Sequence, residues 1–265
     1  MKLSFIFLAL LLALPSLNCS DRKSNRLNPE ATVLLINGNN VQLGEFLLVA
    51  NQRKSDIMNL FRKNISRYPA IDEEKFWNST YDGIKPIEKL ITETEKQLIR
   101  IKIEQELAEQ YRIIKKFDYS DFKHNLKQEN NRRIKAVENK QVIYGPVQYS
   151  EEFYYGYLHN NMVLVLEEVM GKEVFTFTDK MYQNYYEENK ETLFKKFKAK
   201  SSLLSENEEF SGYKKLNEIK QQIRQLLIDQ EYEKLITEKL LTTEIKIVDE
   251  DIVRDMDVIL LKEVI

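Results

Sequence analysis

The sequence contains few of the residues from which most catalytic sites are built. Its 265 residues include one cysteine, two histidines, seven glycines and five prolines. Neither His124 nor His159 has a second histidine or a cysteine at metal-ligand spacing, which argues against a metal site and against a serine–histidine–aspartate site. Glycine-rich phosphate loops, HExxH and GxSxG are also absent. We therefore expect no catalytic residues, no metal, no cofactor and no nucleotide.

Neither sign of charge predominates, and residues that break helices are scarce. Lys and Arg number 40 against 42 Asp and Glu, giving a net charge of −2. A balanced chain lacks the basic field that attracts nucleic acid, so no nucleic-acid partner is expected. No proline follows Pro146, and this scarcity favours long helices over a glycine-rich α/β fold.

The N-terminus has the pattern of an export signal. Lys2 precedes an apolar run over 3–14, which is shorter than the roughly 20 residues that cross a bilayer but fits the core of a signal peptide. The lone Cys19 follows, and it cannot form an internal disulfide. This arrangement resembles a bacterial lipoprotein signal, although Ser16 and Asn18 depart from the usual residues before the cysteine.

The lipoprotein resemblance implies a signal peptide over 1–18, then a lipidated N-terminus and polar tether over 19–32. The chain would be exported and anchored to a membrane through Cys19, facing the periplasm or the cell exterior. The alternative is ordinary signal cleavage or an uncleaved anchor, with Cys19 incidental.

Hydrophobic periodicity predicts a mainly α fold with a short strand near each end. The run "TVLLINGNNVQL" has an Asn-Gly pair between two β-rich segments, which is typical of a hairpin. Apolar residues then recur at helical spacing, most clearly from Ile87 to Ile114 and from Leu216 to Leu240. Ser120 and Thr178 are the expected N-caps of two further helices.

The strand candidates near the two ends are too small to stand alone, because isolated hairpins are marginally stable. We therefore expect Glu244–Val248 to pair with Val33–Ile36. This pairing would close one helical domain over 33–248, with 249–265 as a C-terminal extension.

Tyrosines and methionines are concentrated in the predicted helices that follow Pro146. The simpler interpretation is that they pack between helices, with tyrosine hydroxyls reaching the surface. The alternative is an adaptable surface that binds extended hydrophobic peptide. The candidate client-binding residues are Phe153, Tyr154, Tyr157, Met162, Tyr182 and Tyr185.

Several landmarks occur in an order that resembles the SurA/PrsA-type extracytoplasmic folding factors. The segment "ATVLLINGNNVQLGEF" is similar to the opening of that family, with Ile36-Asn37-Gly38, Val41 and Glu45-Phe46 at the matching positions. Later segments resemble its long second helix, its later helix, the "YYEENKE" segment and the terminal helix with a returning strand. The resemblance spans about Ala31–Val248.

In that family a parvulin prolyl isomerase domain commonly separates "YYEENKE" from the last helix. Here only Leu193–Leu216 lies between them, and no histidine follows His159. The resemblance therefore implies the SurA N-terminal-like chaperone domain without the isomerase. It predicts an ATP-independent chaperone-like protein that is not an enzyme and that binds unfolded or nascent exported proteins of the cell envelope.

Two alternatives stay open. One is a structural or interaction lipoprotein with a single dedicated folded partner. The other is a prolyl isomerase whose active site is not recognisable in the sequence.

Overall fold

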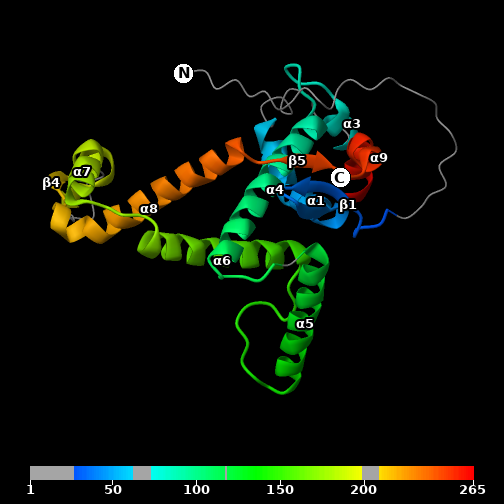
Figure 1. The fold of residues 1–265 in the computed structure, drawn as a ribbon, viewed down its shortest axis with the longest axis horizontal. Coiled ribbons are helices and arrows are strands. Elements are labelled where there is room, and N and C mark those ends of the chain that lie inside the picture. The colour runs from blue at the N-terminus through cyan, green and yellow to red at the C-terminus, as the bar shows by residue number, and fades with distance from the viewer. Residues whose placement is uncertain (1–26, 62–72, 117, 199–208) are drawn as a thin grey trace, which may run out of the picture. The chain divides into compact units, whose positions relative to one another are not determined.

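The structure, a computed structural model, describes residues 27–61, 73–116, 118–198 and 209–265. It is mainly helical with small antiparallel sheets, which confirms the predicted fold class (Figure 1). The predicted signal peptide, Cys19 and most of the tether lie outside the described residues. Among the described helices, none is long and apolar enough to cross a membrane.

The secondary structure runs through the described residues as follows. The helices are α1 (Leu43–Leu60), α3 (Glu73–Asn78), α4 (Pro86–Gln110), α5 (Tyr119–Glu138), α6 (Glu151–Glu173), α7 (Asp179–Leu193), α8 (Leu216–Leu241), α9 (Glu250–Arg254) and α10 (Met256–Glu263). The strands are β1 (Thr32–Ile36), β2 (Asn39–Gln42), β3 (Lys195–Lys198), β4 (Glu209–Tyr213) and β5 (Ile245–Ile247).

The expected single domain is divided into two compact units. Unit 1 comprises Met1–Lys102, Lys116–Tyr157 and Thr243–Ile265, and unit 2 comprises Ile103–Lys115 and Leu158–Thr242. Helices α4 and α6 each contribute residues to both units. The three-stranded sheet belongs to unit 1, and the β3–β4 hairpin belongs to unit 2.

The sheet of unit 1 forms as the sequence predicts. Strands β1 and β2 are joined by Asn37 and Gly38, whose φ angles are 48° and 78°. Two consecutive positive φ angles define the hairpin turn that Asn-Gly favours, because glycine and asparagine tolerate the left-handed region. The predicted hairpin is confirmed.

The predicted pairing of the terminal strands is also confirmed. Strand β5 lies antiparallel to β1, with Leu34 opposite Ile247 and Ile36 opposite Ile245. Asn37 secures the end of this ladder twice. Its N–H donates to the Glu244 carbonyl at 2.9 Å, and its side-chain oxygen accepts from the Glu244 N–H at 3.0 Å. The turn residue thus also fixes the returning chain.

The stretch 249–265, expected to be an extension, forms α9 and α10. Both belong to unit 1, and α10 buries Met256, Ile259 and Leu260. Its apolar residues thus complete the core of this unit, so the stretch is part of the packed structure.

One predicted helix cap is confirmed and one is wrong. The Thr178 side chain accepts a hydrogen bond from the Met181 N–H, as an N-cap does. Helix α5 begins before Ser120, because Asp118 and Asp121 form a reciprocal capping box. The Ser120 N–H instead donates to the Gln42 side chain at 3.1 Å, which joins α5 to the end of β2.

A buried charged cluster joins three helices of unit 1. Glu45 of α1 and Lys102 of α4 are 2% and 3% exposed, and their charged atoms are 2.8 Å apart. Tyr155 of α6 donates to the same Glu45 oxygen at 2.7 Å. The acidic residue of the family-like Glu45-Phe46 pair is therefore a structural residue inside the unit.

Unit 2 has its own core and its own polar cluster. Tyr182 and Phe194 pack against α8 in a core of buried residues that also includes Ile219, Ile223 and Leu227. Elsewhere in the unit, the buried Glu104 carboxylate accepts from the Tyr232 hydroxyl at 3.2 Å and lies 3.0 Å from His159 Nε2. Between α7 and α8, the described residues include strands β3 and β4, which pair antiparallel.

Gly44 allows α1 to approach α5 closely, which yields the first prediction. A Cβ at this position would lie 2.4 Å from Cε1 of the buried Tyr119 ring. A rigid ring in a packed core cannot yield easily, so Gly44→Ala should lower the free energy of unfolding by about 2 kcal/mol. Urea denaturation followed by circular dichroism measures this change.

Gly156 provides the matched control, because it is also a helical glycine of unit 1. A Cβ there would have its nearest neighbour, Gln52 Nε2, at 3.8 Å, an ordinary contact. Gly156→Ala should therefore be neutral or stabilise by about 0.5 kcal/mol through helix propensity. Equal effects of the two substitutions would show that the contact with Tyr119 does not limit the packing.

Glu95 of α4 yields a pH-dependent prediction. Burial raises the pKa of its carboxyl to about 7. The folded protein therefore keeps a proton that the unfolded chain loses, and the free energy of unfolding falls as pH rises from about 4.5 through 7. Glu95→Gln removes this loss. At about pH 8.5 the variant should be more stable by about 2 kcal/mol, with little difference near pH 4.5.

Glu93, on the same helix, serves as a control of opposite sign. Burial acts to raise the pKa of Glu93, but hydrogen bonds from Lys96 and Lys89, each 2.9 Å, outweigh it and lower that pKa. Glu93→Gln should therefore cost stability at neutral pH and less in acid. A Glu95→Gln variant whose urea midpoint changes with pH as the wild type does would contradict the assignment.

Candidate functional site

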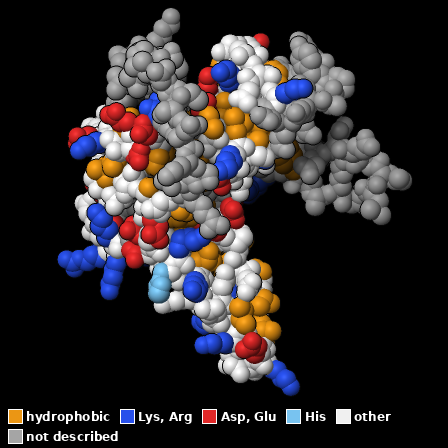
Figure 2. All heavy atoms as spheres, turned by 90° about the vertical axis from the view of Figure 1, so that its right-hand side faces the viewer, with side chains coloured by type: hydrophobic (Ala, Val, Ile, Leu, Met, Phe, Trp, Pro, Cys, Tyr) orange, Lys and Arg blue, Asp and Glu red, His pale blue; other side chains and the backbone are white. Residues whose placement is uncertain are grey.

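The most exposed apolar residues of unit 1 lie on an arm formed by α5 and the loop that follows it. We call residues 119–150 the α5 arm. Val142 and Tyr144 in its loop are 84% and 88% exposed, and Val147 is also exposed. Figure 1 shows α5 projecting from the sheet of unit 1, with the loop returning beside it. Figure 2 shows hydrophobic side chains on this arm next to lysine and arginine side chains.

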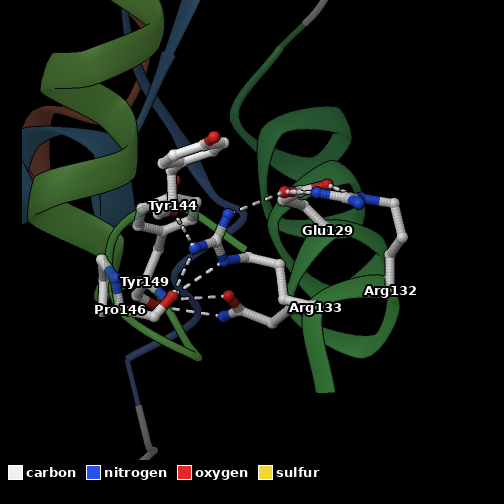
Figure 3. A network of polar contacts seen from close by, with 7 residues as sticks. Glu129, Arg132, Arg133, Tyr144, Pro146 and Tyr149 are labelled. Carbon is white, nitrogen blue, oxygen red and sulfur yellow. Dashed lines mark hydrogen bonds and ion pairs between the residues drawn. The ribbon is translucent and has the colours of Figure 1, made fainter. Parts of the chain in front are cut away.

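Two side chains of α5 hold the returning loop in place (Figure 3). The Asn130 side chain accepts from the Tyr149 N–H at 2.8 Å and donates to the Tyr149 carbonyl at 3.0 Å. Arg133 is buried and donates to the carbonyls of Tyr144 and Pro146. A loop with few hydrogen bonds of its own thereby gains a defined path, because its backbone groups are satisfied by side chains.

Arg133 also positions the ring of Tyr149. Its guanidinium carbon lies 4.4 Å from the centroid of that ring, a cation–π arrangement. Glu129 accepts two hydrogen bonds of 2.7 Å from Arg132 and lies 3.6 Å from Arg133. Hydrogen bonding to Arg132, aided by Arg133, lowers the pKa of Glu129, so this carboxylate stays ionised between the two cations.

Four aromatic rings lie together at the base of this loop. We call Tyr149, Phe153, Tyr154 and Tyr157 the aromatic platform. Five pairs among these rings have centroids 5.3–6.4 Å apart and planes within 7–22° of parallel. Phe153 and Tyr157 are 55% and 48% exposed, while Tyr149 and Tyr154 are partly buried. The platform is therefore an ordered apolar surface that faces solvent in part.

The underside of the platform is packed. Tyr154 stacks on the buried Phe122 of α5, which also contacts Tyr155 edge-on. Burial raises the pKa of Tyr154, so its hydroxyl remains neutral at physiological pH. Because the rings are held from below, little side-chain entropy is lost when a ligand covers them.

The structure brings together three of the six predicted client-binding residues. Phe153, Tyr154 and Tyr157 all belong to the platform in unit 1. Met162 and Tyr182 are buried, each 7% exposed, and Tyr185 packs partly buried against the core of unit 2. These last three are core or core-facing residues of unit 2, so we remove them from the candidate surface.

Sequence reasoning missed the residues of the loop and those that hold it. Val142, Tyr144 and Val147 flank a Gly-Pro pair, and apolar residues beside such a turn signal are a detectable sign of surface display. Asn130 and Arg133 carry no such signal, because they resemble other polar residues of a solvated helix.

The histidines are placed apart. His124 is exposed and contacts Gln128, whereas His159 lies beside Glu104 in unit 2. Within the part of the chain that the structure describes, no group of three or more His, Cys, Asp and Glu residues is arranged to hold a metal ion.

Comparison with known proteins adds no relative. No protein-family model, curated protein or solved structure matches this chain. The resemblance to SurA/PrsA-type folding factors thus rests on the order of sequence landmarks alone.

The two hydrogen bonds between the Asn130 side chain and the Tyr149 backbone, which we call the asparagine clamp, yield a prediction for the loop. Asn130→Ala leaves the Tyr149 N–H and carbonyl without their partner, and each such bond contributes about 1 kcal/mol. Hydrogen exchange at the Tyr149 amide should therefore accelerate by about tenfold or more. The exposed neighbour Asn131 is the control, and Asn131→Ala should leave that rate unchanged. Equal exchange in both variants would rule out the clamp.

Proposed function

We propose that this chain is an exported, ATP-independent chaperone-like protein that binds unfolded or extended segments of envelope proteins at the aromatic platform. The observation that supports the proposal is the ordered, half-exposed set of aromatic rings, together with the exposed Val142, Tyr144 and Val147 on the loop that leads into Tyr149. Contiguous exposed apolar surface on a folded unit typically marks an interaction site.

The energetics of such a surface suit weak binding of many sequences. Covering the exposed parts of Phe153, Tyr157 and Tyr144 would contribute on the order of 1–2 kcal/mol each. After the cost of ordering an unfolded ligand, this corresponds to an affinity of about micromolar. Aromatic faces impose little directional requirement, so different apolar segments can occupy them.

Release would need no nucleotide. A client that folds buries its own apolar segments, and mass action then favours dissociation. A lipid on Cys19 would hold the platform near a membrane, where exported chains emerge. Export, lipidation, periplasmic or external location and the absence of isomerase activity all remain parts of the proposal.

The test is suppression of aggregation. An unfolded outer-membrane protein is diluted from denaturant with stoichiometric full-length chain, and light scattering is recorded. We expect the wild type to suppress scattering. The double variant Phe153→Ser/Tyr157→Ser, shown to be folded by circular dichroism, should require at least about threefold more protein for the same effect, because it loses the exposed rings.

The matched control is Phe197→Ser/Phe210→Ser on the β3–β4 hairpin. These rings are 50% and 49% exposed and contact each other, so the control removes similar apolar surface elsewhere. Equal loss in both variants would mean that exposed apolar area in general, and not the platform, is responsible. No suppression by the wild type would contradict the proposal and favour a lipoprotein with one folded partner.

A further inference from the structure

The α5 arm differs in charge from the rest of the chain. Residues 119–150 contain six Lys and Arg against three Asp and Glu, a net charge of +3. The whole chain carries −2, so everything outside the arm sums to −5. Of the platform residues only Tyr149 lies in the arm, whereas Phe153, Tyr154 and Tyr157 follow Glu151 and Glu152 on α6. With these two carboxylates included, residues 119–157 carry a net charge of +1. The platform therefore borders the positive arm of an otherwise acidic protein.

One positive group of the arm lies directly against the platform, because the guanidinium carbon of Arg133 is 4.4 Å from the centroid of the Tyr149 ring. Arg132 forms an ion pair with Glu129, whose carboxylate also lies 3.6 Å from Arg133. Lys127 precedes the clamp residue Asn130 by three positions, which places both on one side of α5. Arg133 thus lies beside the surface on which a ligand would rest, and Lys127 is on the same side of α5 as Asn130, which binds Tyr149.

These charges are only partly neutralised by the protein itself. Glu129 is shared between Arg132 and Arg133, so one carboxylate faces two guanidinium groups. Among the described residues, Lys127, Lys135 and Lys140 form no ion pair, and all three are exposed. The arm therefore retains cations that can pair with a ligand.

We propose that the platform selects extended polypeptide segments in which carboxylates neighbour apolar side chains, and disfavours basic segments. This inference rests on the proposed function and names its substrate class. Apolar side chains of the segment cover the rings, while its Asp or Glu residues approach Arg132 and the lysines. A basic segment of equal hydrophobicity meets like charges at the same positions, which weakens its binding.

An anionic lipid surface is the rival partner for a positive, apolar arm. Lipid-binding segments typically cluster four to eight basic residues without acidic ones between them. Here Glu129 and Glu138 interrupt the basic residues of α5. The mixed pattern and the ordered rings fit a peptide better than a bilayer.

The experiment compares three dye-labelled unstructured peptides of equal length and equal apolar spacing. Their polar positions are acidic, neutral or basic, and fluorescence anisotropy measures binding to the full-length chain. We expect the acidic peptide to bind at least about fivefold more tightly than the basic one in low salt. The preference should shrink between about 50 and 300 mM salt, because screening weakens exposed charge pairs.

The variant Lys127→Gln/Arg132→Gln/Lys135→Gln should lose the preference and keep its affinity for the neutral peptide within about twofold. The control Lys85→Gln/Lys246→Gln/Lys262→Gln removes the same charge from exposed positions of unit 1 outside the arm, and should keep the preference. If both variants lose the preference for the acidic peptide to the same extent, the preference arises from the net charge of the protein and not from the arm. That result would overturn the inference.

The remaining outcomes separate the two proposals. Binding of all three peptides with equal affinity overturns the charge selection and leaves the proposed function standing. Failure to bind any peptide overturns both. Binding to phosphatidylglycerol vesicles that the triple arm variant abolishes, together with charge-independent peptide binding, would assign the positive face to lipid and overturn the inference.

Discussion

The arrangement of unit 1 depends on the buried pair of Glu45 and Lys102. Removing both charges from water is costly, and the cost is offset only if the partners meet at hydrogen-bonding distance. They do so at 2.8 Å, and Tyr155 donates to the same oxygen. Three helices must therefore be correctly placed at once, since an error in any of them would leave a buried charge uncompensated. The platform residues of α6, which are Phe153, Tyr154 and Tyr157, lie on either side of Tyr155 in the sequence.

In the α5 arm, too, a buried charged group requires partners in fixed positions. Arg133 is buried because three functions converge on it: it binds loop carbonyls, lies against the Tyr149 ring and approaches Glu129. Val142 and Tyr144 are exposed, so their burial cannot hold the loop in place. The hydrogen bonds to the loop backbone hold it instead. Because polar side chains hold the backbone, the apolar side chains of the loop can be exposed while the loop keeps a defined path. The proposed binding of unfolded segments, and the proposed selection of acidic ones, both depend on that property.

Much of the fold could be predicted because its signals are local. The Asn37-Gly38 turn follows from the φ angles those residues tolerate, and the long helices follow from apolar spacing. Even the non-local pairing of β5 with β1 was predictable, since neither short strand is stable alone. The start of α5 was not, because Asp118, Ser120 and Asp121 are all good capping residues. Asp118 and Asp121 cap each other, while Ser120 contacts Gln42 instead. Likewise, the sequence does not show which glycines support close packing, as Gly44 does.

The candidate site, like the fold, was predictable from the sequence only in part. By itself the sequence determined the mainly helical class, the paired terminal strands and a concentration of aromatic residues after Pro146. Only the tertiary structure decided which aromatics face solvent: Phe153 and Tyr157 are exposed, whereas Met162 and Tyr182 are buried. The physical reason is that an aromatic side chain at helical spacing suits a core and a surface equally well. Its exposure depends on what packs against that side of the helix, which distant segments of the chain supply.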